Sequence, residues 1–212
     1  MSQLPKRALC ARCLRPQSSC ICQWVRPIAH QVQVLVLQHP LEVAHAKGSA
    51  RLLGMSLAHS RLVTGEAFDE DELSALLNQP WRGESVDAPP RQTVLLYPAT
   101  PLNPAPTWPL AGDEAPKDPH HLRLVVLDGT WRKSRKMLHL NPVLQTLPRL
   151  ALRDRLPSNY RIRKAHLPDQ LSTLEATCAA LAQLEGDADA FEPLLQAFDG
   201  FVAQHMAYRP GV

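Results

Sequence analysis

The chain has 212 residues, of which 45% are hydrophobic and 20% are charged, and its formal net charge is +3. These values are typical of a soluble globular protein, and no apolar run approaches the ~20 residues that a membrane-spanning helix needs. The first residues also lack the apolar core of a secretory signal, so the sequence predicts a cytoplasmic protein with reduced cysteines and no membrane partner.

Apolar runs, caps and helix breakers divide the first half of the chain into secondary-structure elements. Residues 1–26 form a small segment that contains four of the five cysteines. After it we expect, in order, a buried strand over 32–37, a helix over 47–58, a short strand over 62–64, a helix over 69–78 and a strand over 93–97. Residues 98–119 are rich in proline, which predicts an exposed loop.

The second half of the chain continues the same alternation. We expect a strand over 122–128, a helix over 130–139, a short segment over 143–147, a strand over 149–152, a loop over 153–166 and helices over 171–185 and 191–208. Strands that alternate with helices predict an α/β fold with a largely parallel sheet and flanking helices. We therefore divide the chain into a small unit at 1–26 and an α/β domain at 27–212. Neither G-x-G-x-x-G nor the P-loop pattern is present, which counts against these two kinds of nucleotide site.

Cysteines at Cys10, Cys13, Cys20 and Cys22 give the pattern C-x2-C-x6-C-x-C. Four thiolates this close together can close a tetrahedral zinc site, and reduced thiols at this spacing are more often metal ligands than disulfide partners. The alternative is a cluster without metal that is sensitive to oxidation. Since the protein would fill all four positions, the predicted Zn2+ has a structural role. Cys178 lies in an Ala- and Leu-rich helix and is expected in the core.

The stretch from residue 122 to 136 is the most informative in the chain. A buried strand ends at Asp128, and open α/β sheets bind their ligands at the carboxyl ends of strands. Asp128 can accept or hold a proton, and Trp131 can stack on a base. Four cations that can hold phosphates follow: Arg132, Lys133, Arg135 and Lys136. The plainer interpretation is a strand end with Asp128 or Thr130 as a helix N-cap and a solvated basic helix face.

Positive charge is concentrated between residues 123 and 164, where eleven Arg or Lys residues stand against two Asp residues. The difference is a local net charge of +9, so the rest of the chain is net acidic. A field of this kind suits a polyanion such as a nucleic acid. Within this window, Tyr160 stands beside Arg161, Arg163 and Lys164. This combination can stack on bases and hold phosphates, or it can form a solvated basic loop.

Two further segments are candidates for contact with a polar ligand. The segment 38–42 directly follows the strand over 32–37, and His39 and Glu42 could orient a polar substrate. On spacing alone, a proline-assisted turn into a helix with Glu42 as a first-turn acid is favoured. Ser172, with Glu175 three residues later, matches a capping box at the start of a helix. Backbone N–H groups at such a start favour a carboxylate or phosphate, although the local pattern fits a plain cap better.

Taken in order, these motifs resemble the DTW-domain family, whose members are tRNA-uridine aminocarboxypropyltransferases distantly related to the SPOUT class of RNA-modifying enzymes. The D-G-T-W sequence at 128–131, with the basic run after it, is the most specific of them. The matching stretches are the four cysteines, L-Q-H-P-x-E at 37–42, L-Y-P at 96–98, L-D-G-T-W at 127–131, S-x-Y-x-x-R-K at 158–164 and L-S-T-x-E-A at 171–176. The resemblance therefore covers most of the chain.

The resemblance implies a reaction and a set of site residues. The reaction would transfer the 3-amino-3-carboxypropyl group of S-adenosylmethionine to N3 of a uridine in tRNA and release 5′-methylthioadenosine. Asp128, Thr130 and Trp131 would be the catalytic residues, with Asp128 either taking the N3 proton or only orienting ligands. The expected S-adenosylmethionine contacts are Gln38, His39, Leu96, Tyr97, Pro98, Asp128, Ser172 and Thr173. The expected tRNA contacts are Trp131, Arg132, Lys133, Tyr160, Arg163 and Lys164.

The resemblance also implies a SPOUT-like C-terminal part, a class in which some backbones are knotted, with tRNA as the partner and no obligatory protein partner. Two other functions keep part of this interpretation. One is a SPOUT-like RNA methyltransferase, which would release S-adenosylhomocysteine instead. The other is a zinc-stabilised RNA-binding module without catalysis, against which the ordered motifs at successive strand ends argue. The sequence leaves open which uridine is modified, the oligomeric state and whether the backbone is knotted.

Overall fold

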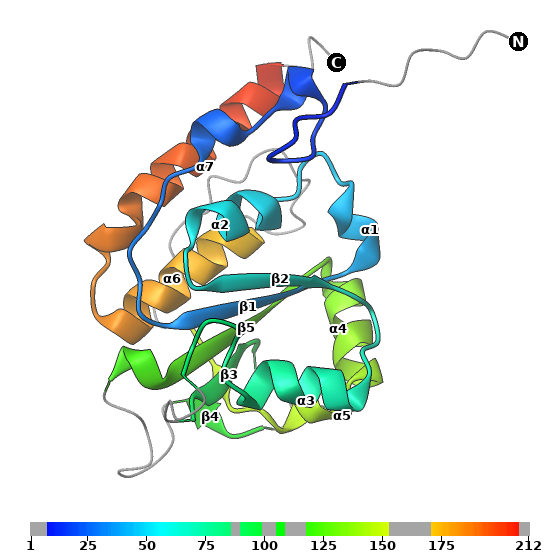
Figure 1. Cartoon of the computed structure of the whole chain (residues 1–212), viewed down its shortest axis with the longest axis vertical. Coiled ribbons are helices and arrows are strands. Elements are labelled where there is room, and N and C mark those ends of the chain that lie inside the picture. Colours follow the sequence, from blue (N-terminus) through cyan, green and yellow to red (C-terminus); the bar gives the residue numbers. More distant parts are fainter. Residues whose placement is uncertain (1–7, 86–89, 99–104, 109–117, 153–170, 208–212) are drawn as a thin grey trace, which may run out of the picture.

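A computed structural model describes residues 8–85, 90–98, 105–108, 118–152 and 171–207 of the chain (Figure 1). Within these residues, the centre of the molecule is a six-stranded, all-parallel sheet with the strand order β2-β1-β5-β3-β6-β4. The strands are β1 (Gln33–Gln38), β2 (Ser60–Thr64), β3 (Gln92–Leu96), β4 (Thr107–Trp108), β5 (Leu122–Asp128) and β6 (Arg149–Leu150). The predicted α/β fold with a largely parallel sheet is confirmed.

Helices cover both faces of the sheet (Figure 1). One face carries α2 (Ala50–Ser56), α6 (Thr173–Glu185) and α7 (Glu192–Ala207), and the other carries α3 (Glu70–Asn78), α4 (Trp131–Leu140) and α5 (Pro142–Thr146). The short helix α1 (Pro40–Val43) follows β1, and the 3-10 turns are η1 (Gln17–Ser19), η2 (Cys22–Trp24), η4 (Pro119–His121) and η5 (Asp189–Phe191). None of the helices in the described residues combines the length and the apolar composition needed to span a membrane.

Side chains alternate between two cores along the central strands. Val34 and Val36 of β1 join the core under α2, α6 and α7, whereas Leu35 and Leu37 join the core under α3, α4 and α5. Cys178 of α6 is buried in the first core, as predicted. Because helices cover both faces, β1 and β5 are buried along their whole length, which explains why they are nearly continuous apolar runs in the sequence.

The largest differences between the expected and the observed elements lie in two places. The exposed loop predicted over 98–119 is wrong at Thr107–Trp108, which forms β4 beside β6 with the Trp108 side chain only 8% exposed. A strand of two residues has no periodic pattern, so its proline-rich flanks dominated the prediction. The helix expected over 47–58 begins at Ala50. A separate turn, α1, precedes it with proline at its first position, which confirms the proline-assisted interpretation of residues 38–42.

The N-terminal segment packs against α7 (Figure 1). The ring of Trp24 lies so close to Gly200 that a Cβ added there would come within 2.2 Å of it, and the indole N–H donates to the Gln204 side chain. Cys13 and Ile21 are buried in the same core as α6 and α7. The described part of this segment therefore shares a core with the sheet domain, and the division at residue 26 stays a prediction.

The strand order reverses direction between β1 and β5. The chain leaves β1 for β2 on one side of this pair and leaves β5 for β6 on the other side. Open α/β sheets bind their ligands outside the carboxyl ends of the strands at such a reversal. β1 and β5 are paired in register up to Gln38 and Asp128, which end the two strands. The topology therefore places these two residues where a ligand site is expected.

Candidate functional site

Asp128 is the centre of the candidate site. Its side chain is 3% exposed, and each carboxylate oxygen accepts one hydrogen bond. The hydroxyl of Thr173 at the start of α6 donates to Oδ1 at 2.6 Å, and the side-chain amide of Gln38 at the end of β1 donates to Oδ2 at 2.8 Å. These bonds join three elements at one carboxylate, and each oxygen keeps a second lone pair that can accept from a ligand.

His39 connects the end of β1 to a second acid. Its Nδ1 accepts the backbone N–H of Leu41 at 3.1 Å, which places the ring proton on Nε2, where it donates to Glu66 Oε1 at 2.8 Å. Glu66 also pairs with Lys136 at 2.7 Å. The ammonium of Lys136 and the His39 ring hold the pKa of Glu66 below its ordinary value. Glu66 is not among the residues predicted from the sequence, although its position just after the strand over 62–64 was a usable signal.

The cations of the basic helix α4 fall into two groups, those paired with an acid and those exposed to solvent. Thr130 is the N-cap and accepts the backbone N–H of Lys133, as the plainer interpretation predicted. The ammonium of Lys133 pairs with the buried Glu42 at 2.9 Å, and Lys136 pairs with Glu66. By contrast, two arginines of α4 are exposed and have no ion pair within the described residues: Arg132 and Arg135. These arginines are the α4 side chains best placed to meet an external anion.

Three side chains form an aromatic and cationic cluster: Trp131 at the start of α4, Tyr97 just after β3 and Arg149 at the start of β6. Trp131 is 51% exposed, and its ring meets the buried ring of Tyr97 edge to face, with centroids 5.6 Å apart. On Tyr97, the Arg149 guanidinium lies 5.6 Å from the ring centroid. Leu96 is half-buried and Pro98 is exposed, so Tyr97 is the member of the L-Y-P motif that contacts other site residues. The exposed Trp131 ring can stack on a base.

Protein groups accept most of the backbone N–H groups at the start of α6. Ser172 and Glu175 form the predicted capping box, in which the Ser172 hydroxyl accepts the Glu175 N–H at 3.1 Å and the Glu175 carboxylate accepts the Ser172 N–H at 2.7 Å. The N–H of Leu174 donates to the hydroxyl of Ser49 at 3.3 Å. Ser49, which is buried just before α2, was missed because nothing in the sequence links it to a helix 125 residues away. The first turn of this helix thus already binds a carboxylate of its own.

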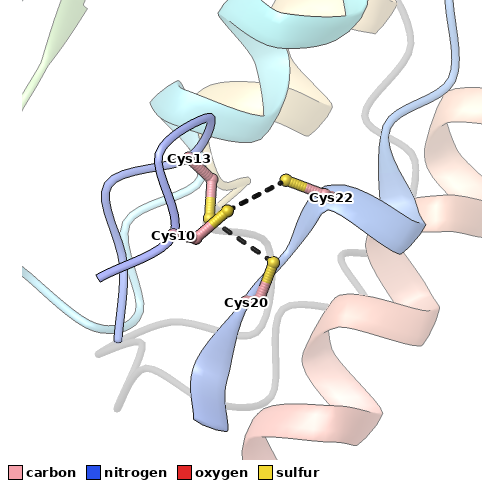
Figure 2. A group of neighbouring side chains, drawn as sticks. All are labelled: Cys10, Cys13, Cys20 and Cys22. Carbon is pink, nitrogen blue, oxygen red and sulfur yellow. Dashed lines mark hydrogen bonds between the residues drawn. The ribbon is translucent and has the colours of Figure 1, made fainter. Parts of the chain in front are cut away.

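The four N-terminal cysteines form one compact cluster (Figure 2). Their sulfurs all lie within 4.8 Å of one another, and the Cys10–Cys22 and Cys13–Cys20 pairs are each 3.7 Å apart. No disulfide joins them. A Zn–S bond of about 2.3 Å in a tetrahedron places sulfurs about 3.8 Å apart, so the donor set and its spacing fit a structural Zn2+.

Two of these thiols have pKa values that are shifted in opposite directions. The backbone N–H groups of Cys13 and Arg12 lower the pKa of Cys10 to about 6. Burial and the neighbouring sulfurs raise the pKa of Cys22 to about 12. Four thiolates this close together would repel one another, so a bound cation is what allows all four to be deprotonated. The Arg15 guanidinium, from the loop between Cys13 and Cys20, donates to the backbone oxygens of residues 46 and 48. The predicted tRNA contacts Tyr160, Arg163 and Lys164 lie outside the described residues.

Comparisons with known proteins agree on one family. A family model described as the DTW domain matches residues 7–206. The chain is 28% identical over 212 residues to tRNA-uridine aminocarboxypropyltransferase 2 of Mus musculus, covering 95% of this chain. It is 29% identical over 195 residues to the Drosophila melanogaster protein of the same name, covering 90% of this chain and 72% of the relative.

Identity to tRNA-uridine aminocarboxypropyltransferase A of Arabidopsis thaliana is 25% over 209 residues, covering 88% of this chain and 76% of the relative. The chain spans 66% of the length of the mouse protein. No solved structure matches the chain.

Proposed function

This chain belongs to the DTW domain family, and from that membership we propose that it transfers the 3-amino-3-carboxypropyl group of S-adenosylmethionine to N3 of a uridine in tRNA. The names of its relatives support transfer of this group to tRNA uridine. The observation that carries the proposal is the buried Asp128 carboxylate, held by Gln38 and Thr173 at the strand-order reversal. The exposed Trp131 follows it on the same strand-to-helix turn.

The proposed reaction exchanges one bond for another. The proton on N3 passes to a base, and the N3 lone pair attacks the carbon of the aminocarboxypropyl group that is bonded to the sulfonium sulfur. The carbon–sulfur bond breaks with its electron pair on sulfur, so the neutral thioether 5′-methylthioadenosine leaves. Transfer of this group rather than the methyl requires N3 to lie in line behind that carbon, which is a matter of how the site orients both reactants.

Asp128 is our candidate for the group that takes or directs the N3 proton. Its two hydrogen bonds fix the plane of the carboxylate, and the free lone pairs can accept from a ligand N–H. A positioned carboxylate base typically contributes ~10²–10⁴-fold to a rate. We assign Trp131 to stacking on a base that is turned out of the tRNA fold, and Arg132 with Arg135 to phosphates beside it.

The proposal is tested by product analysis with the purified chain. The chain is incubated with S-adenosylmethionine and tRNA from a strain that lacks its gene, and both products are followed by mass spectrometry. We expect 5′-methylthioadenosine together with uridine that has gained one aminocarboxypropyl group. Release of S-adenosylhomocysteine with a methylated nucleoside would replace the proposal with the methyltransferase. Binding of tRNA with no product from S-adenosylmethionine would leave only an RNA-binding module.

A further inference from the structure

The sheet contains two buried arginines that differ in how their charge is satisfied. Arg123 and Arg149 are each 1% exposed. Every nitrogen of the Arg123 guanidinium donates to the protein: Nε to the Gln33 side chain at 2.9 Å, Nη1 to the Leu76 carbonyl at 2.7 Å and Nη2 to the Gln79 carbonyl at 2.9 Å. Arg123 lies at the amino end of β5 and is a structural residue.

Arg149 lacks such partners. Its Nη2 donates to the Gln145 carbonyl at a long 3.4 Å, and its buried Nε and Nη1 have no hydrogen-bond partner among the described residues. No carboxylate of the described residues lies within ion-pair distance of it. Burial lowers the pKa of Arg149, against a smaller opposing effect of Tyr97. A buried, unpaired cation costs stability, so its presence beside a candidate site indicates that a ligand completes it.

The position of Arg149 connects it to the candidate site. β6 pairs with β3, and the guanidinium stacks on Tyr97, the residue that follows β3. Tyr97 in turn contacts Trp131. Arg149 therefore lies on the α4 side of the sheet, one aromatic ring away from the tryptophan of the D-G-T-W motif. In the sequence, nothing distinguishes Arg149 from the other arginines between residues 123 and 164, so it was predictable only as part of that basic window.

We propose that Arg149 binds the carboxylate of the amino-acid part of S-adenosylmethionine. This inference rests on the proposed function. The other candidate is the helix start at 172–173, which is an expected S-adenosylmethionine contact. There the Leu174 and Glu175 N–H groups already donate to serine hydroxyls, and the Glu175 carboxylate accepts the Ser172 N–H. The negative charge of the Glu175 carboxylate would repel a second carboxylate at this helix start. Phosphates of tRNA have exposed arginines on α4 available to them, which leaves the buried guanidinium for the smaller anion.

A ligand carboxylate at Arg149 would accept charge-assisted hydrogen bonds from the guanidinium. Charge-assisted hydrogen bonds in a site shielded from water are stronger than neutral ones. Because Nε and Nη1 are buried, the ligand reaches them only if a neighbouring side chain such as Tyr97 turns as it binds, a common kind of adjustment in binding sites. Loss of such a bond typically lowers affinity by ~10- to 100-fold.

The test compares two ligands that differ only by the carboxylate. Binding of S-adenosylmethionine and of decarboxylated S-adenosylmethionine is measured by calorimetry for the wild-type chain, for Arg149→Met and for Arg123→Lys. We expect the wild type to prefer the intact ligand by ~10- to 100-fold. Arg149→Met should lose this preference and leave affinity for the decarboxylated ligand unchanged. Arg123→Lys should lose thermal stability and keep the preference.

Stability without ligand gives a second readout. Arg149→Met removes an unpaired buried charge and should not lower the unfolding temperature, since apolar replacement of buried charge is often neutral or stabilising. The proposal is overturned if Arg149→Met keeps the ligand preference, or if it weakens tRNA binding alone. It is also overturned if the wild type binds both ligands equally, which would leave the proposed function intact. A wild type that binds neither ligand would instead refute the proposed function itself.

Discussion

Two side chains from distant parts of the chain hold the carboxylate of Asp128. Gln38 precedes it by 90 residues and Thr173 follows it by 45. The apolar run before Asp128 was enough to predict a strand end, and the D-G-T-W motif was enough to predict a site. Which partners the carboxylate has was not predictable, because it depends on strand pairing and on the docking of α6. The exact chemistry of the residue is therefore a property of the tertiary structure.

Replacing Asp128 by Asn should abolish most activity. An amide offers one acceptor oxygen, so its NH2 group would face either the Gln38 amide or the Thr173 hydroxyl, both of which donate to Asp128. We expect single-turnover release of 5′-methylthioadenosine to fall by ~10²–10⁴-fold and stability to fall by about 1–3 kcal/mol. Thr173→Ser, which keeps the hydroxyl, is the matched control and should stay near wild type. A wild-type rate for Asp128→Asn would remove this residue from the chemistry.

His30 should make the stability of the protein depend on pH. The ring is buried, its Nδ1 donates to the Val32 carbonyl at 2.9 Å, and its Nε2 accepts the His59 N–H at 3.0 Å, so it is held neutral. Burial lowers the pKa of His30, and this effect outweighs the hydrogen bond with Val32, which raises it. Smaller effects of His59 and Glu185 lower and raise the pKa, respectively. Because the folded pKa lies below the ordinary value of 6.5, this contribution is complete above pH 6.5 and is lost as the pH falls through the folded pKa.

Denaturant unfolding between pH 5 and 8 measures this effect. We expect the free energy of unfolding of the wild type to decrease below about pH 6.5. His30→Gln keeps a donor and an acceptor but does not titrate, so its curve should be flatter over the same interval. Parallel curves for the two proteins would show that His30 does not carry the pH dependence.

At the scale of elements, the packing of α7 on the N-terminal segment requires a glycine at position 200, next to the Trp24 ring. A Cβ at Gly200 would lie 2.2 Å from the Trp24 ring, far closer than real contacts allow. An alanine in the interior of a helix is usually favourable by roughly 0.5–1 kcal/mol relative to glycine. Here we expect Gly200→Ala to destabilise the protein by about 1–3 kcal/mol, because the tryptophan must move.

The control for Gly200 is a glycine in another helix. At Gly54 of α2 the nearest atom to an added Cβ is the Leu62 Cβ at 4.0 Å, an ordinary contact. Gly54→Ala should therefore leave stability unchanged or raise it by up to about 1 kcal/mol. Urea unfolding of both variants decides the matter, and equal effects at the two positions would contradict the close packing of Trp24.

The cations of α4 should separate into RNA-binding and structural residues. Lys133 and Lys136 are paired with acids, whereas Arg132 and Arg135 are exposed without an ion pair in the described residues. Replacing both arginines by Gln should weaken tRNA binding and reduce the slope of log affinity against log salt by about 2. Replacing both lysines should leave the slope close to wild type. A larger change of slope for the lysine pair, measured by filter binding, would reverse this assignment.

Element prediction succeeded where a pattern was long enough to repeat. β1, β5 and α6 were expected within a few residues of their observed ends because apolar runs and a capping box mark them. β4 was missed because two residues cannot show a period. Glu66 lies at a strand end and could have been predicted as a site residue by the same rule that found Asp128.

At the scale of the whole molecule, the class of the fold was predictable and the order of its strands was not. Alternation of strands and helices requires a parallel sheet covered on both faces. The position of β5 between β1 and β3 depends on pairing across 90 residues, which no local pattern specifies. That insertion creates the strand-order reversal beside Asp128. The position of the candidate site at Asp128 therefore follows from the general rule for such sheets only once the strand order is known.

The cysteine cluster is connected to the rest of the fold through the core that it shares with α6 and α7. Cys13 is a candidate zinc ligand and is also fully buried in the core that contains α6 and α7, with Ile21 beside it in that core. A metal at the cluster would fix the spacing of four cysteines and with it the position of Trp24 on α7. Structural Zn2+ contributes directly to folding free energy, since the unfolded chain offers no preformed site.

Removal of this metal should destabilise the entire chain in one transition. Zn2+ released to a chelator should reach one equivalent per chain, and a stability loss of ~3 kcal/mol would lower the unfolding temperature by about 6–12 °C. Cys22→Ser should abolish binding of this equivalent, while Cys178→Ala, at the fifth cysteine, should keep it. A full equivalent of zinc in Cys22→Ser would rule out the four-cysteine site. Separate melting of the N-terminal segment, with the sheet domain unchanged, would instead show that the shared core contributes little, because Cys13 and Ile21 could then leave it without cost.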